Sequence, residues 1–92
     1  MKGPLPATMK KTTFSLEVPQ AQAVLLAGSF TQWELGAIAL KRLKSGVWKT
    51  TVALEPGSYR YRFIVDGHWH DDPACTHHEA NPFGSEDCIV TV

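Results

Sequence analysis

The segment Ser58–Val65 (SYRYRFIV) alternates bulky apolar side chains with polar or charged ones. Its aromatic residues therefore fall on one face and its two arginines on the other, as in a β-strand that is buried on one side. Turn-forming residues flank the segment: Glu55-Pro56-Gly57 precedes it, and Asp66-Gly67, a typical hairpin turn, follows it. A repeat of two residues bounded by turns predicts a β-strand with one face in the core.

Short segments of the same kind recur along the chain, and none shows a helical period. They cover residues 12–18, 22–29, 37–43, 47–54, 68–71 and 87–92. Roughly seven strands at this spacing predict an all-β fold, an antiparallel β-sandwich. Trp48 is in phase with Leu54, so we expect its indole in the core. Residues 72–86 form a long polar loop, and loops of that length tend to be functional.

Length and charge narrow the possible functions. The chain has 92 residues, which suits one domain, and nine Lys and Arg balance nine Asp and Glu. Nucleic-acid-binding proteins usually carry a basic excess, so we expect no nucleic-acid partner. No apolar run reaches the ~18 residues of a membrane span, so we expect no membrane association. We expect a flexible N-terminal leader over residues 1–11, a domain over residues 12–92 and, with two cysteines, a cytoplasmic location.

Two of the three tryptophans are not in phase with the apolar face of a long strand. Trp33 has polar neighbours, and Trp69 follows the hairpin turn between two histidines. Either they cover an open end of the sandwich, or they form platforms on which the apolar face of a sugar ring stacks. We expect both to be substantially exposed on one shared surface. Arg62 is likewise either a solvated charge or a donor to sugar hydroxyls beside a stacked ring, and both interpretations leave it exposed.

The sequence gives little support to catalysis. It has no nucleophile-elbow motif, no phosphate-binding glycine loop and no Cys-His signature. A glycosidase needs two carboxylates at a fixed separation, but the adjacent Asp71 and Asp72 would point to opposite faces of a strand. We therefore expect a protein that is not an enzyme; a truncated glucan hydrolase is the least favoured alternative.

A second cluster of reactive side chains lies between His68 and His78 and includes Cys75. These residue types can bind zinc, but the paired spacing of a zinc finger is missing, so we expect no metal site and no other cofactor. Cys75 and Cys88 could form a disulfide in an oxidising compartment, but we expect two free thiols.

Several motifs in order resemble the family-48 carbohydrate-binding modules. They are VLLAGSFTQW at residues 24–33, GVW at 46–48, LEPGSYRYRFIVDGHW at 54–69 and DP at 72–73. The resemblance covers residues 12–92. The family includes the glycogen-binding domains of AMP-activated kinase β subunits and the N-terminal modules of isoamylases and glycogen branching enzymes.

The resemblance implies an immunoglobulin-like, early-set β-sandwich that binds α-1,4-linked glucans such as glycogen or starch without cleaving them. Trp33 and Trp69 correspond to the family's sugar-stacking tryptophans, and Arg62 corresponds to a lysine in the same strand. Phe83 corresponds approximately to a leucine that contacts the glucan. Asp87 corresponds approximately to an asparagine that bonds sugar hydroxyls, but it departs from the family in being an aspartate. The alternative is a protein-interaction module that packs on a catalytic domain or a kinase subunit.

Overall fold

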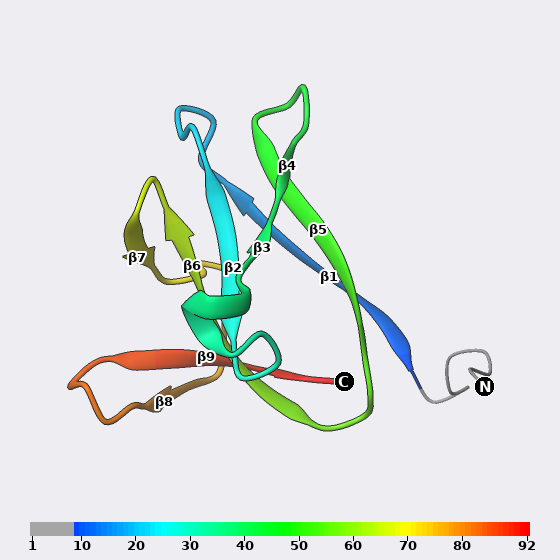
Figure 1. Cartoon of the computed structure of the whole chain (residues 1–92), viewed down its shortest axis with the longest axis vertical. Coiled ribbons are helices and arrows are strands. Elements are labelled where there is room, and N and C mark those ends of the chain that lie inside the picture. Colours follow the sequence, from blue (N-terminus) through cyan, green and yellow to red (C-terminus); the bar gives the residue numbers. More distant parts are fainter. Residues whose placement is uncertain (1–8) are drawn as a thin grey trace.

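The computed structural model describes residues 9–92 (Figure 1). The described residues form nine strands and one short 3-10 helix. These are β1 (Lys10–Glu17), β2 (Val24–Gly28), η1 (Trp33–Gly36), β3 (Ile38–Ala39), β4 (Lys41–Arg42), β5 (Val47–Leu54), β6 (Ser58–Val65), β7 (His68–His70), β8 (His78–Ala80) and β9 (Glu86–Thr91). Residues 1–8 of the predicted leader (residues 1–11) lie outside the described part of the chain. The last two residues of that segment already belong to β1, which begins at Lys10. Within the described part, no helix is long and apolar enough to cross a membrane.

The strands form two antiparallel sheets, which confirms the predicted β-sandwich. One sheet has the order β1-β5-β4, and the other has the order β3-β2-β6-β9-β8, with β7 paired to β6. In Figure 1 the long, paired β1 and β5 run obliquely toward the lower right of the view. β6 is the central strand of the larger sheet, because it pairs with β2, β7 and β9.

The core consists of the inward faces that the alternation predicts. Phe14 and Leu16 come from β1, and Tyr61 and Phe63 from β6; all four are buried. Trp48 is 7% exposed, as expected for a core residue. Because its indole Nε1 donates to the carbonyl oxygen of Val18 at 3.1 Å, the buried ring leaves no unpaired polar group.

Two ionisable groups of the core have raised pKa values, the phenol of Tyr61 on β6 and the thiol of Cys88 on β9. The hydroxyl of Tyr61 donates to the Asp72 carboxylate at 2.6 Å, and burial together with this bond raises the pKa of the phenol. Burial, with a contribution from Cys75, raises the pKa of the Cys88 thiol to about 12. The tyrosine therefore keeps its proton at neutral pH and anchors the loop after β7 to the sheet.

The structure has more strands than the sequence predicts, for two reasons. The predicted strand 37–43 is two strands, because the chain passes from one sheet to the other at the buried Leu40: β3 pairs with β2, and β4 pairs with β5. The predicted loop 72–86 contains β8, which pairs with β9. All residues of β8 are exposed, so no apolar alternation marks this edge strand in the sequence.

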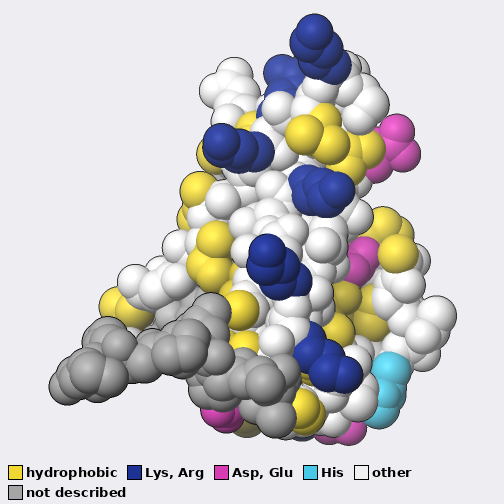
Figure 2. Space-filling view, turned by 90° about the vertical axis from the view of Figure 1, so that its right-hand side faces the viewer, with side chains coloured by type: hydrophobic (Ala, Val, Ile, Leu, Met, Phe, Trp, Pro, Cys, Tyr) yellow, Lys and Arg dark blue, Asp and Glu magenta, His cyan; other side chains and the backbone are white. Residues whose placement is uncertain are grey.

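Charged residues are unevenly distributed over the described surface. The three-stranded sheet and its β4–β5 turn carry all the described lysines and one arginine, namely Lys10, Lys11, Lys41, Arg42, Lys44 and Lys49. Figure 2 shows Lys and Arg side chains spread along one side of the molecule. We refer to these six residues as the basic face.

The turn between β6 and β7 is fastened by one carboxylate. Asp66 has a left-handed backbone (φ 49°), which aspartate tolerates better than most residues. Its Oδ1 accepts from the backbone N–H groups of Gln22 and Ala23, each at 2.8 Å, so it fixes the segment that enters β2.

We expect Asp66→Ala to lower the free energy of unfolding by about 1–2 kcal/mol, because two backbone N–H groups lose a charged acceptor. Asp66→Asn keeps an oxygen at the same position and tolerates the same backbone, so it should cost less than half as much. Urea unfolding of the three proteins measures both effects. Equal losses in the two variants would contradict the role given to Oδ1.

Candidate functional site

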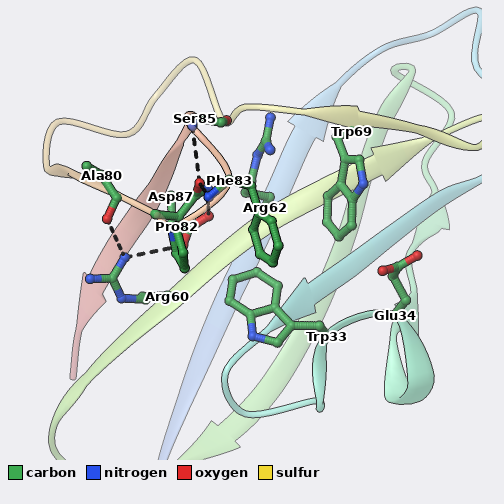
Figure 3. Close-up of a pocket in the computed structure, with 11 residues that line it drawn as sticks. Trp33, Glu34, Arg60, Arg62, Trp69, Ala80, Pro82, Phe83, Ser85 and Asp87 are labelled. Atoms are coloured by element: carbon green, nitrogen blue, oxygen red, sulfur yellow. Dashed lines mark hydrogen bonds and ion pairs between the residues drawn. The ribbon is translucent and has the colours of Figure 1, made fainter.

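A groove of about 620 Å³ opens on the larger sheet, beside β6. Its lining comes from η1, β6, β7 and the β8–β9 turn, and consists of Trp33, Glu34, Arg60, Arg62, Trp69, Ala80, Asn81, Pro82, Phe83, Ser85 and Asp87. In Figure 3, Trp33 and Trp69 lie toward one end of the groove, and Arg60 and Asp87 toward the other. The structure thus brings all five predicted site residues into one cavity, although they span more than half of the chain.

The position of Trp33 depends on a tight turn after β2. Gly28 is required there, because a Cβ atom would collide with the carbonyl oxygen of Arg60. The buried Thr31 Oγ1 accepts from the N–H of Gly28 at 3.0 Å, and its hydroxyl donates toward the carbonyl oxygens of Gly28 and Trp33, 3.1 and 2.9 Å away. One buried hydroxyl therefore holds the loop that presents the indole.

Backbone strain accompanies this turn. Gln32 and Trp33 both have left-handed backbones, with φ values of 58° and 57°. Such angles are uncommon for residues other than glycine and cost of order 1 kcal/mol or more, so the surrounding structure must stabilise them. Strain concentrated at an aromatic residue on the wall of a groove indicates that the orientation of the ring matters for function.

The two groove tryptophans meet edge to face. The ring centroids of Trp33 and Trp69 are 6.5 Å apart, with an angle of 67° between the ring planes. Trp69 remains 42% exposed, and Trp33 is half-buried. The indoles therefore share one surface, as expected, and they present two faces that are tilted relative to each other.

Arg62 lies beneath Trp69 rather than in solvent. Its side chain is 16% exposed, its Nε donates to Asp71 Oδ1 at 3.0 Å, and its guanidinium carbon is 5.5 Å from the centre of the Trp69 ring. The expectation of an exposed arginine is therefore wrong, because the ion pair and the cation–π contact hold the side chain against the protein. These contacts fix the indole from below.

Phe83 stands at the tip of the turn between β8 and β9 and is 90% exposed. The side chain of Asn81 shapes this turn, since its Oδ1 accepts from the N–H of Phe83 at 3.0 Å and of Ser85 at 3.2 Å. An aromatic ring that is almost fully exposed on a structured turn is an unusual solvent-facing apolar surface.

Asp87 is buried, and both of its carboxylate oxygens are engaged within the protein. Arg60 donates to Oδ2 at 3.3 Å, and Asn81 Nδ2 donates to Oδ1 at 3.0 Å. Arg60 also donates to Glu79 Oε1 at 2.8 Å and to the carbonyl oxygen of Ala80 at 3.3 Å. In this arrangement Asp87 orients Arg60 and Asn81 and has little free surface of its own.

The sequence analysis did not identify most of the polar residues that line the groove, among them Glu34, Arg60 and Asn81. Arg60 follows the same alternation as Arg62 and could have been found from it. Asn81 gives no signal of its own, because its role depends on the β8–β9 pairing, which the polar sequence of β8 conceals. Glu34 enters the groove through the 3-10 turn of η1, which no periodicity marks.

Comparison with known proteins assigns a family to nearly the whole chain. Residues 11–92 match a family described as the glycogen recognition site of AMP-activated protein kinase. The match includes every strand from β2 to β9 and all the residues that line the groove.

Individual relatives carry similar segments. The chain is 43% identical over 53 residues to protein PTST homolog 2, chloroplastic, from Arabidopsis thaliana. The aligned segment covers 58% of this chain and 10% of that protein. It is 32% identical over 82 residues to a 1,4-alpha-glucan branching enzyme of Frankia casuarinae, covering 83% and 10% of the two chains. It is 35% identical over 63 residues to the AMP-activated protein kinase subunit beta of Schizosaccharomyces pombe, covering 65% and 20%.

The similarity therefore spans only 10 to 20% of the length of these relatives. The match to the family is far more extensive, because it covers nearly the whole of this chain. The chain belongs to the carbohydrate-binding family of the glycogen recognition site of AMP-activated protein kinase.

Proposed function

We propose that the groove binds α-1,4-linked glucans and that Trp33 and Trp69 are the platforms on which the sugar rings stack. The observation that carries the proposal is the pair of indoles on one open surface, with Phe83 facing the same groove. A glucose ring has an apolar face of C–H groups, which an indole can cover while neighbouring polar groups bond the hydroxyls. Family membership supports a glucan ligand.

The tilt of the two indoles favours an α-linked chain. An α-1,4 glucan curves, so successive sugar rings present faces at an angle, whereas a β-1,4 glucan is a flat ribbon. Planes at 67° suit successive rings of a curved chain better than those of a ribbon. Phe83, which also lines the groove, can then fill the concave side of the curve.

The polar groups of the groove have distinct roles in this proposal. Arg62 and Arg60 offer guanidinium N–H groups to sugar hydroxyls from positions fixed by ion pairs. Asp87 acts as a positioning residue, since its oxygens already accept from Arg60 and Asn81. This replaces the direct sugar contact that the resemblance implied for Asp87.

The groove is proposed to be non-catalytic. Glycosidases place two carboxyl groups on either side of the scissile bond. The carboxylates of this groove are Glu34 and Asp87, and Asp87 is held by an arginine and an amide. Because Asp87 is engaged by these partners, Glu34 has no second free carboxylate in the groove with which to act, so we expect no cleavage of a glucan that binds.

For the whole protein we propose a targeting role. The relatives include a branching enzyme and a kinase subunit, each with a similar segment within a longer chain. The domain would hold a catalytic or regulatory partner on a glucan polymer. Packing of the groove against such a partner is the competing proposal, and it would bury Phe83, which is 90% exposed in the chain by itself. A cytoplasmic location remains a proposal that rests on cysteine usage alone.

Substituting either tryptophan tests the platforms. Trp33→Ala and Trp69→Ala should each weaken binding of maltoheptaose by about fivefold or more, because one stacked aromatic is worth ~1 kcal/mol beyond its buried area. Isothermal titration measures the affinity, and a parallel assay for released sugars should stay blank. Leu35→Ala is the matched control: Leu35 is 90% exposed on η1 but does not line the groove.

Tryptophan fluorescence assigns the response to individual rings. The double variant Trp33→Phe/Trp69→Phe retains only the buried Trp48, so its emission should not change when maltoheptaose is added, whereas that of the parent should. A parent-like response in the double variant, or unchanged affinity in both alanine variants, would move the site away from this groove.

The Thr31 hydroxyl should matter for both stability and binding. Thr31→Val keeps the shape of the side chain but removes the buried hydrogen bonds, and we expect a loss of about 1–3 kcal/mol in stability and a weaker affinity for maltoheptaose. Thr31→Ser retains the hydroxyl and should retain most of both. Urea unfolding and titration separate the two effects; normal affinity in a destabilised Thr31→Val protein would show that Trp33 needs no such support.

Binding should depend little on salt and pH. A neutral glucan releases no counterions, so the affinity should stay within about twofold between ~50 mM and 500 mM salt, unlike binding to a polyanion. No histidine lines the groove among the described residues, so we also expect a flat response between about pH 6 and 8. Titration of maltoheptaose under these conditions measures both. A steep loss with salt would instead indicate an anionic ligand on the basic face.

A further inference from the structure

Three potential metal ligands meet on the side of β9 that faces away from the groove. The Sγ atoms of Cys75 and Cys88 each lie 3.9 Å from Nδ1 of His78. All three ligand atoms lie within 4.8 Å of one another. Because neighbouring strand residues point to opposite faces, Cys88 points away from the groove that Asp87 lines.

Backbone pairing holds these side chains together without an ion. His78 and Cys88 are directly opposed in the β8–β9 ladder, which places their side chains on one face of the hairpin. Cys75 belongs to the loop before β8, and its N–H donates to the carbonyl oxygen of Asp72 at 3.0 Å. Asp72 in turn accepts from the Tyr61 hydroxyl at 2.6 Å, so the loop is anchored to the central strand.

The separations suit a tetrahedral ion. Zinc bonds of about 2.3 Å to sulfur and 2.0–2.1 Å to nitrogen at the tetrahedral angle place S and N about 3.5–3.6 Å apart. The observed S–N separations of 3.9 Å would have to shorten by a few tenths of an ångström. The two sulfurs, which lie within 4.8 Å of each other, would have to come to about 3.8 Å, the S–S separation at a tetrahedral zinc ion. Small movements of an exposed histidine and a half-buried cysteine can supply this change.

The ligand types select the ion. Two thiolates and one imidazole favour zinc and other thiophilic cations, whereas calcium and magnesium prefer oxygen ligands, of which this cluster has none. We propose that Cys75, His78 and Cys88 bind one zinc ion, with a water molecule as the fourth ligand. The ion would replace the thiol protons and tie the loop before β8 to the β8–β9 hairpin.

This site was not evident in the sequence, because Cys88 lies ten residues beyond His78 and only the β8–β9 pairing brings the two together. A disulfide between Cys75 and Cys88 is the competing use of the same thiols. It would leave the imidazole without a function, although its Nδ1 is equidistant from the two sulfurs. The position of His78 therefore favours the ion.

Titration of the full chain, reduced and freed of metal, with Co²⁺ and then Zn²⁺ tests the proposal. We expect one Co²⁺ per chain, a near-ultraviolet charge-transfer band from thiolate ligation, and the strong visible bands of a tetrahedral site. Zn²⁺ should displace Co²⁺ stoichiometrically. A saturating excess of Zn²⁺ should raise the thermal unfolding midpoint by several degrees, because the ion binds the folded state.

Variants identify the ligands. Cys75→Ala and His78→Ala change residues outside the core, so the fold should survive, and each should weaken metal binding at least tenfold; Cys75→Ala should also reduce the charge-transfer band. His77→Ala is the matched control, because the neighbouring side chain is 61% exposed and lies outside the cluster.

Two results in the metal titration would overturn the proposal: no stoichiometric binding of Co²⁺ or Zn²⁺, or binding by Cys75→Ala as tight as by the unsubstituted protein. A third would be a purified protein whose mass is lower by two hydrogens, which indicates a disulfide, and whose metal binding does not improve when the disulfide is reduced. Titration of the metal-free protein with maltoheptaose keeps this test separate from the proposed function, because the tryptophan platforms include none of the three ligands.

Discussion

The two-residue alternation of β6 is the constraint on which the rest of the structure depends. One face of this strand supplies Tyr61 and Phe63 to the core, and the opposite face supplies Arg60 and Arg62 to the groove. Hydrogen bonds to β2, β7 and β9 surround the strand, so its register fixes both faces at once. A slip of one residue would bury the arginines and expose the aromatic rings. Stability and the candidate site are therefore determined by the same backbone pairing.

The rigid sheet alone does not explain how the aromatic side chains are aimed. Two turns do that, each organised by one polar side chain: Thr31 fixes the left-handed turn that carries Trp33, and Asn81 fixes the turn that carries Phe83. A groove formed in advance loses less conformational entropy when a flexible sugar chain binds. The strain stored at Trp33 is the cost of this arrangement, and the buried hydroxyl of Thr31 offsets it.

The sequence predicted the parts of the fold that repeat locally and missed those that depend on pairing between distant segments. The alternation of β6 and the phase of Trp48 correctly predicted their buried faces. Trp33 and Trp69, which are out of phase with the core, correctly pointed to one shared surface. The crossing between sheets at Leu40 and the polar edge strand β8 were missed, because neither changes the apolar pattern. The burial of Arg62 was missed for a related reason, since its partner Asp71 comes close only through the β6–β7 hairpin.

The charges of the groove argue for an uncharged ligand. Arg60 is paired with Glu79 and Asp87, and Arg62 is paired with Asp71, so three carboxylates surround two guanidinium groups. An anionic ligand would have to compete with these carboxylates, whereas a hydroxyl needs only one of the N–H donors that each planar guanidinium holds in a fixed direction. The described lysines, which attract anions as compact, hydrated charges, are located on the basic face instead. The arginines and lysines within residues 9–92 thus form two sets, one that can donate hydrogen bonds at the groove and one that provides positive charge on the other sheet.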